Sequence, residues 1–388
     1  MRKEVIEEII STEKKDCLLL LPTSYGKTLI ALEKMKSLVE PKQVKILIVI
    51  PRLVLIQNWK DEITKWGYEQ YLPFITFVTY VSFPKKAGKW DIVIFDEVHH
   101  LSERCREALE SFEIKHSIML SATVNRNIRY EITRLFPDLL IKRISVREAI
   151  EEDILPDPKV YLIPLELDNT IYNHEIIKNK GKKNEITIMY SERYQHREKD
   201  RKIIIKCTER QYYDDMSSLI LWYKNKMFVE IYKNLYLRKC GERLKWLSDK
   251  KTDAVQKILS LLKDVKTLTF CNGIEQTEKL GKYCINSKNS NSSENLDKFN
   301  KGKIKHITAC NMLDEGVNLT NCQVGIYASL NSSERMIIQK MGRLLRHKEP
   351  IIIIPYFKNT RDEEIVNKMM IQYNSENVQI VELKDFKI

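Results

Sequence analysis

The residues of this sequence best suited to phosphate chemistry lie in the stretch 18–28, which reads LLLLPTSYGKT. An apolar run breaks at Pro22 into a small polar loop that closes on Gly26, Lys27 and Thr28, followed by residues typical of a helix. Backbone amides of such a loop bind phosphate oxygens, the lysine reaches the terminal phosphates, and the hydroxyl ligates Mg²⁺. The first glycine of the GxxxxGK[ST] pattern is missing, so the loop alone is equally consistent with an ordinary turn.

Two adjacent carboxylates follow another apolar run. Asp96 and Glu97 come directly after residues 91–95, where one could hold Mg²⁺ through water and the other could orient a hydrolytic water. The next run, 117–120, ends in the small residues 121–123. Each feature alone could be a helix cap or a solvated turn. Their order along the chain favours a nucleotide-hydrolysing site.

A cation suited to a transferred phosphoryl group comes from the other half of the chain. Arg343 and Arg346 are three residues apart on a predicted helix, so they share one face. Paired arginines can be mere surface charge. Because the phosphate loop and the carboxylate motif of the first half contain no arginine, these two are candidates for an arginine finger from a second domain.

The elements that must position these residues are short apolar runs separated by helical segments. In the first part of the chain the runs are 17–21, 45–50, 75–80, 91–95 and 117–120. From residue 265 the pattern resumes with 266–270, 304–309, 324–328 and 351–356. Continuous apolar runs are typical of parallel sheets covered by helices on both faces. We therefore predict an α/β protein with two doubly wound parallel-sheet domains, residues 1–143 and 265–388.

The segment 144–264 has a different pattern, which predicts a linker and a mainly helical, basic insertion associated with the second domain. A proline-punctuated strand is predicted at 159–167, and apolar residues recur at helical spacing over 216–235. Basic and aromatic residues alternate along its helices: Trp222, Lys224, Lys226, Tyr232, Lys233, Tyr236, Arg238 and Lys239. They could bind a nucleic-acid backbone and stack on bases, but the same pattern fits a core stripe with a solvated face.

Composition adds weaker indications. The chain has 388 residues, of which 43% are hydrophobic and 30% charged, and a net charge of +12 that favours a polyanionic partner. An A+T-rich genome, such as that of a virus or phage, also produces a lysine-rich protein. Eight cysteines without a CxxC pair and seven histidines without HExxH favour a reducing compartment, cytoplasmic or nuclear, and indicate no structural metal site. We expect no signal peptide and no membrane segment.

Taken in order, these motifs resemble those of superfamily 2 DExH-box helicases and translocases, in particular the XPB-like and phage UvsW-like branch. The matching segments run from motif I to motif VI: PTSYGKT (22–28), VIPRLVLIQNW (49–59), VTY (78–80), DEVHH (96–100), SAT (121–123), TFCNG (269–273), MLDEGVNL (312–319) and QKMGRLLRH (339–347). The resemblance implies two RecA-like domains, ATP and Mg²⁺ as cofactors, and nucleic acid as partner, with DNA favoured over RNA.

The resemblance also implies a role for each matching residue. Nucleotide binding would involve Pro22, Thr23, Ser24, Tyr25, Gly26, Lys27, Thr28, Gly316 and Asn318. Thr28 and Asp96 would hold Mg²⁺, and Glu97 would activate water. The residues closing on the γ-phosphate would be Gln339, Arg343 and Arg346. Hydrolysis would be coupled to motion by His99, Ser121, Ala122 and Thr123. The groove that tracks one strand through its phosphates and sugars would include Pro51, Arg52, Thr79, Tyr80 and Asn272.

The expected activity is therefore that of an ATP-dependent helicase or translocase that moves 3′ to 5′ as a monomer, with an accessory protein supplying targeting. Two alternatives remain open: a nucleic-acid-sensing ATPase, and a duplex translocase or remodeller that does not separate strands, including an RNA-directed or transcription-related role. Two residues of motif V depart from the family pattern, because Cys310 stands where a threonine is usual and Asn318 where an aspartate is usual.

Overall fold

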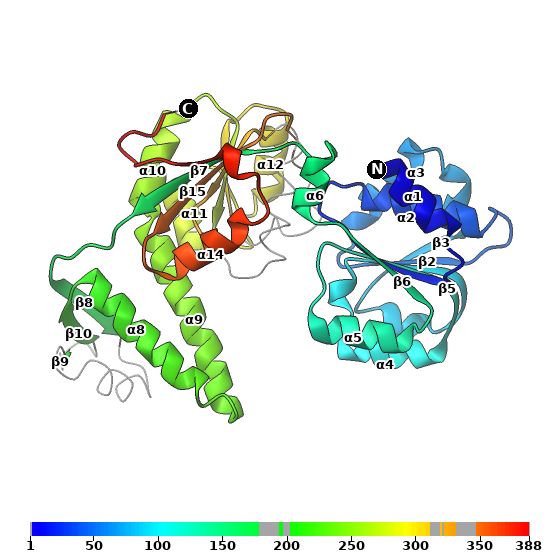
Figure 1. Ribbon diagram of the computed structural model, residues 1–388, viewed down its shortest axis with the longest axis horizontal. Helices are drawn as coiled ribbons and strands as arrows, with labels where there is room; N and C mark the ends of the chain where they lie inside the picture. The colour runs from blue at the N-terminus through cyan, green and yellow to red at the C-terminus, as the bar shows by residue number, and fades with distance from the viewer. Residues whose placement is uncertain are drawn as a thin grey trace.

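The computed structural model describes residues 2–177, 194–196, 202–310, 319, 322–330 and 347–387. Two parallel sheets form separate lobes, and a pair of long helices extends from the second lobe (Figure 1). Short helix α6 (Val146–Glu151) lies between the lobes, and the capping box of Ser145 with Glu148 fixes its first turn. In the described part of the chain, no helix is both long and apolar enough to cross a membrane.

The first sheet has six parallel strands in the order β3-β2-β4-β5-β1-β6. They are β1 (Asp16–Leu20), β2 (Ile46–Ile50), β3 (Ile75–Thr79), β4 (Gly88–Asp96), β5 (Phe112–Ser121) and β6 (Leu139–Arg143). One face is covered by α1 (Arg2–Ser11), α2 (Lys27–Leu38) and α3 (Leu55–Lys65), and the other by α4 (Glu103–Ala108) and α5 (Arg126–Leu135) (Figure 1). The predicted doubly wound domain is confirmed.

Burial on both faces explains the sequence of these strands. Every residue of β2, Ile46–Ile50, is buried, with alternate side chains in the cores on either side of the sheet. The edge strand β6 was not predicted, because Leu139–Arg143 is short, half-buried and ends in charged residues. Short 3₁₀ segments complete the domain: η1 (Glu69–Phe74), η2 (Phe83–Lys86), η3 (Val98–His100) and η4 (Leu109–Ser111).

The second sheet has seven parallel strands in the order β12-β13-β11-β14-β15-β7-β16. They are β7 (Lys159–Leu165), β11 (Thr267–Cys271), β12 (Cys284–Ile285), β13 (His306–Cys310), β14 (Val324–Tyr327), β15 (Ile351–Phe357) and β16 (Val378–Ile380). Helices α10 (Thr252–Leu261) and α11 (Ile274–Leu280) cover one face, and α12 (Ser292–Asn300) and α14 (Arg361–Met370) the other. Another 3₁₀ turn, η5 (Ser375–Asn377), precedes β16.

Strand β7 corrects our assignment of its residues to the insertion. Lys159–Leu165 pairs in parallel with β15 along its whole length, so it is an internal strand of the second sheet. Helix α10 also packs on this sheet, through Val255 and Ile258. Both elements precede residue 265, and the wide sequence separation between β7 and its partner concealed their pairing.

The remainder of the insertion is a helical hairpin beside a small antiparallel sheet. Helices α8 (Glu209–Lys224) and α9 (Glu230–Lys250) pack against each other. The sequence predicted helical structure here, but the turn between the two helices interrupts the predicted spacing over 216–235. The small sheet has the order β8-β10-β9, with β8 (Tyr172–Ile177), β9 (Tyr194–His196) and β10 (Lys202–Cys207). The sequence did not predict these strands.

A buried ion pair fastens the base of this hairpin to the second sheet. Lys251, between α9 and α10, places its Nζ 2.8 Å from Oδ2 of Asp362 in the first turn of α14, and their side chains are 0% and 1% exposed. The Phe357 amide at the end of β15 donates to the same carboxylate oxygen. Removing one partner would leave the other charge buried without compensation.

We therefore predict that Lys251→Met lowers the free energy of unfolding by about 3 kcal/mol. The matched control is Lys301→Met, because Lys301 pairs with Asp297 at the same 2.8 Å but both side chains are more than half exposed. An exposed pair contributes about 0–1 kcal/mol. Urea unfolding of both variants measures the difference, and equal shifts would contradict the structural role of the buried pair.

Candidate nucleotide site

The loop between β1 and α2 has the backbone geometry of an anion-binding turn. Gly26, which precedes α2, has φ 101°, and Ser24 has φ 70°, so two residues of the loop are in the left-handed region that favours glycine. No side chain caps the start of α2, which leaves its first amides without a helical acceptor. The buried Thr23 Oγ1 has no hydrogen-bond partner among the described residues. This arrangement suits a bound phosphate.

Tyr25 contributes to this loop in a different way. Its side chain is fully buried in the core of the first domain, and its amide donates to the Pro22 carbonyl. The ring therefore anchors the loop to the domain and is not available to contact a nucleotide directly.

The loop lysine is paired with the second carboxylate of the DEVHH motif. Nζ of Lys27 lies 3.2 Å from Oε1 of Glu97, and both side chains are largely buried. Burial alone would raise the pKa of Glu97, but the Lys27 ammonium and the His99 contact outweigh it and hold that pKa well below its usual range. Glu97 is therefore ionised at neutral pH.

The backbone at Glu97 is strained. Its φ of 52° and ψ of 58° are in the left-handed region, which a residue with a Cβ adopts at a cost. Glu97 lies between the end of β4 and η3, and its carbonyl accepts the His100 amide. Such strain persists only where surrounding contacts hold it, and here those contacts come from the phosphate loop and from His99 and Ser121.

A hydrogen-bonded group joins the DEVHH motif to the SAT motif. Nδ1 of His99 lies 2.9 Å from Oγ of Ser121 and 3.3 Å from Oε2 of Glu97. The Ser121 hydroxyl is 2.8 Å from the Thr123 carbonyl, and the Leu21 amide at the start of the phosphate loop donates to the Ser121 carbonyl. The strand order β4-β5-β1 explains this meeting, because Ser121 ends the strand between the other two. Ala122, which follows it, is half-buried and packs against the core.

Asp96 is held by two aromatic side chains whose roles the sequence did not reveal. Nε1 of Trp59, on α3, donates to Oδ2 of Asp96 at 2.9 Å, and the Tyr80 hydroxyl donates to the Asp96 carbonyl at 2.8 Å. Trp59 is 3% exposed. A buried indole needs an acceptor, which is the signal that could have indicated a polar partner for Trp59.

Tyr80 therefore requires a correction. The resemblance placed it at the strand-tracking groove, but its side chain is buried and braces the Asp96 backbone. The physical reason is that β3 and β2 are neighbours and β2 adjoins β4, so a residue just after β3 can reach the end of β4.

The donor set near Asp96 is compatible with Mg²⁺. Asp96 offers carboxylate oxygens and Thr28, in the first turn of α2, offers a hydroxyl, and Mg²⁺ takes such oxygens together with water and substrate phosphates. No group of three or more His, Cys, Asp or Glu side chains suited to a metal occurs among the described residues.

The residues proposed to contact nucleic acid lie in both parallel-sheet domains. Pro51 and the exposed Arg52 follow β2, and Thr79 ends the adjacent β3, so these three lie at one edge of the first sheet. Asn272 follows β11 in the second sheet, where its amide donates to Oε1 of Gln276. The candidates outside the described residues are Gly316, Asn318, Gln339, Arg343 and Arg346.

Two family models match this chain. Residues 1–126 match the model described as "Type III restriction enzyme, res subunit", and residues 250–348 match the "Helicase conserved C-terminal domain". The first match lies within the first parallel-sheet domain, and the second lies within the second domain and ends before β15. Helix α8 and nearly all of α9 lie between the two matches.

Known proteins resemble the chain in sequence and in fold. It is 27% identical over 378 residues to "DNA 3'-5' translocase XPB2" of Sulfurisphaera tokodaii, covering 90% of this chain and 80% of the relative. Dbp5 of S. cerevisiae, solved bound to RNA and ADP BeF3, superposes with a TM-score of 0.61 at 11% identity, over 99% of this chain and 90% of that one. The Hef helicase domain of Pyrococcus furiosus superposes with a TM-score of 0.53 at 13% identity, over 95% and 97%.

The two structural neighbours share the RecA-like helicase fold, which confirms the predicted fold class. The two family matches and the relative named as a translocase add the enzymatic identity. The chain is an ATP-hydrolysing superfamily 2 helicase/translocase of the XPB-like kind.

Proposed function

We propose that this enzyme is a DNA motor that moves 3′ to 5′ along one strand and uses ATP hydrolysis to separate strands or remodel branched DNA. The relative named as a DNA 3'-5' translocase supports the substrate and the direction. The net charge of +12 supports binding through phosphates, which carries no sequence preference. We further propose that it acts as a monomer, with a separate protein for targeting, in a reducing compartment where its eight free cysteines remain thiols.

The observation that carries this proposal is the contact of Lys27 with Glu97. When bound, ATP would supply the phosphoryl group, and Mg²⁺ would neutralise part of the phosphate charge. Lys27 then exchanges the Glu97 carboxylate for phosphate oxygens, and Glu97, ionised and released from the ammonium, orients the attacking water and accepts its proton. The same Glu97 carboxylate contacts His99, and His99 contacts Ser121. Nucleotide binding at the phosphate loop would therefore change contacts within both the DEVHH and the SAT motifs.

Asp96 is proposed to hold the metal in an orientation set by Trp59. The indole N–H occupies one carboxylate oxygen and fixes the plane of the carboxyl group. Partners of this kind typically change metal affinity by about 10- to 100-fold. By resemblance, the second domain supplies Gln339, Arg343 and Arg346 to the γ-phosphate, and Gly316 and Asn318 to the nucleotide.

The proposed function is tested by ATP hydrolysis with a panel of nucleic acids: single strands, blunt duplexes, forks and Holliday junctions, each as DNA and as RNA. We expect DNA with a single-stranded region or a branch to give the highest rate. Stimulation by RNA alone would contradict the proposed substrate, and hydrolysis insensitive to every nucleic acid would contradict the motor.

We predict that Lys27→Ala removes nearly all ATP hydrolysis and leaves DNA affinity within severalfold, because the ammonium acts on phosphate charge. The control is Lys36→Ala, which removes an exposed lysine from the same helix. Steady-state hydrolysis and DNA titration measure the two effects. Wild-type turnover in the Lys27 variant would rule out the assignment of the phosphate loop.

Trp59→Phe removes the indole N–H while it keeps an aromatic ring in the core. We expect the Mg²⁺ concentration for half-maximal hydrolysis to rise about tenfold, because Asp96 loses the donor that orients it. Trp66→Phe is the matched control, since Trp66 follows the same helix and its Nε1 donates to the exposed Glu62. Equal Mg²⁺ requirements in both variants would show that Trp59 only fills space.

The lowered pKa of Glu97 also predicts a pH dependence of stability. A carboxyl group with a folded pKa below its unfolded value contributes stability above the unfolded pKa of about 4.3, and loses it as pH falls towards the folded value. The difference in unfolding free energy between wild type and Glu97→Gln should therefore shrink from about pH 5 to about pH 3. Urea unfolding across this range measures it, and parallel curves would contradict the assigned pKa.

A further inference from the structure

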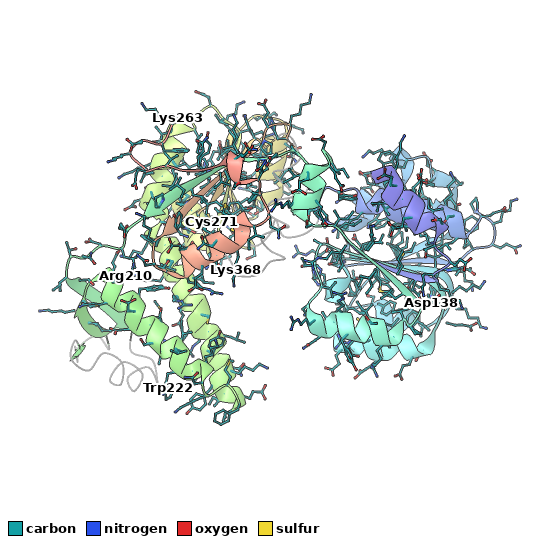
Figure 2. All side chains as sticks on the ribbon, viewed as in Figure 1. Asp138, Arg210, Trp222, Lys263, Cys271 and Lys368 are labelled. Atoms are coloured by element: carbon teal, nitrogen blue, oxygen red, sulfur yellow. The ribbon has the colours of Figure 1, made fainter. Side chains whose placement is uncertain are left out.

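The turn between α8 and α9 forms a well-ordered end to the helical hairpin. Helix α8 ends at Lys224 and α9 begins at Glu230. The connection is closed by backbone hydrogen bonds, with the Met227 amide donating to the Lys224 carbonyl and the Val229 amide to the Lys226 carbonyl. This end of the hairpin points away from the second parallel sheet (Figure 1), and Trp222 lies near it (Figure 2). We call residues 221–233 the hairpin apex.

The hairpin apex exposes an unusual amount of apolar surface. Phe228 is 86% exposed at the turn itself. Large apolar side chains around it are also exposed: Leu221, Trp222, Met227, Val229 and Ile231. These six exposed side chains lie within eleven residues of sequence, whereas exposed apolar residues on a soluble protein are ordinarily scattered singly. Their concentration at one turn therefore points to a binding surface.

Three aromatic rings on the two helices of the hairpin apex pack against one another. The Trp222 and Tyr232 rings meet edge to face with their centroids 5.6 Å apart, and the buried Tyr223 packs against both. Nζ of Lys226 lies 3.8 Å from the centroid of the Trp222 ring and 5.6 Å from that of Tyr232. The apex is therefore a rigid aromatic platform with a cation held on its surface.

The charge of the apex is predominantly positive. Between residues 221 and 233 there are three lysines, Lys224, Lys226 and Lys233, and one acidic residue, Glu230. Aromatic rings interleaved with lysines are the combination that binds single-stranded nucleic acid, since bases stack on the rings while the ammonium groups neutralise phosphates. The charge therefore favours an unpaired nucleic-acid strand over an apolar protein surface as the occupant.

We propose that the hairpin apex binds an unpaired strand of nucleic acid, with a base stacked on Phe228 and phosphates held by Lys224 and Lys226. This inference rests on the proposed function and adds a binding site to it. The hairpin is fastened to the second sheet through Lys251 and Asp362, so a base held at the apex moves with the second domain. At a fork, a base stacked there is kept from its pairing partner.

The experiment compares the affinity of full-length variants for single-stranded DNA and for a blunt DNA duplex at several salt concentrations. Phe228→Ala should weaken single-strand binding about tenfold and leave duplex binding unchanged, because only unpaired bases offer a free face. Phe228→Trp should retain wild-type affinity. The matched control, Leu237→Ala, removes a 57% exposed apolar side chain farther along α9 and should have no effect.

Salt dependence separates stacking from charge. Lys226→Gln should reduce the slope of log K against log salt by about 0.7, whereas Phe228→Ala should leave that slope unchanged. Equal single-strand affinity of Phe228→Ala and wild type would overturn the proposal for the hairpin apex. A protein partner would then be the better candidate to bind this surface. If the wild type itself binds no DNA, the proposed function fails, so the two failures are distinguishable.

Discussion

The site depends on one electrostatic constraint, the pairing of Lys27 with Glu97 in a largely buried environment. Each charge would be costly to bury alone, and together they hold a carboxylate ionised on a strained backbone at the end of β4. In the proposed function a bound nucleotide competes for Lys27, which would make the position of Glu97 sensitive to occupancy of the loop. Because His99 contacts the same carboxylate, this competition is transmitted beyond the phosphate loop.

Parallel-sheet topology brings these groups together. The carboxyl ends of β1, β4 and β5 are adjacent, so a loop, two carboxylates and a serine that are far apart in sequence meet at one edge. The neighbouring β2 leads into α3, from which Trp59 reaches Asp96. The first domain therefore supplies both the groups proposed to react and the side chains that contact them.

Much of this arrangement could be predicted from the sequence, because continuous apolar runs and the order of polar residues after them are local patterns. The pairing of strands that are distant in sequence could not be predicted in this way. Lys159–Leu165 looked like part of an insertion, since nothing near it in sequence identifies β15 as its partner. A related reason explains why the sequence did not reveal the buried positions of Tyr25, Trp59 and Tyr80. The sequence of a motif does not show whether its aromatic side chain contacts a ligand or packs in the core and supports the site.

The measurement that tests the account most directly is displacement of a third strand from triplex DNA during ATP hydrolysis, because it reports movement without requiring strand separation of the duplex. We expect wild type to displace the third strand and Glu97→Gln to do so about 100-fold more slowly while it still binds DNA. Rapid hydrolysis by wild type without displacement would contradict the account, as would displacement by Glu97→Gln at the wild-type rate.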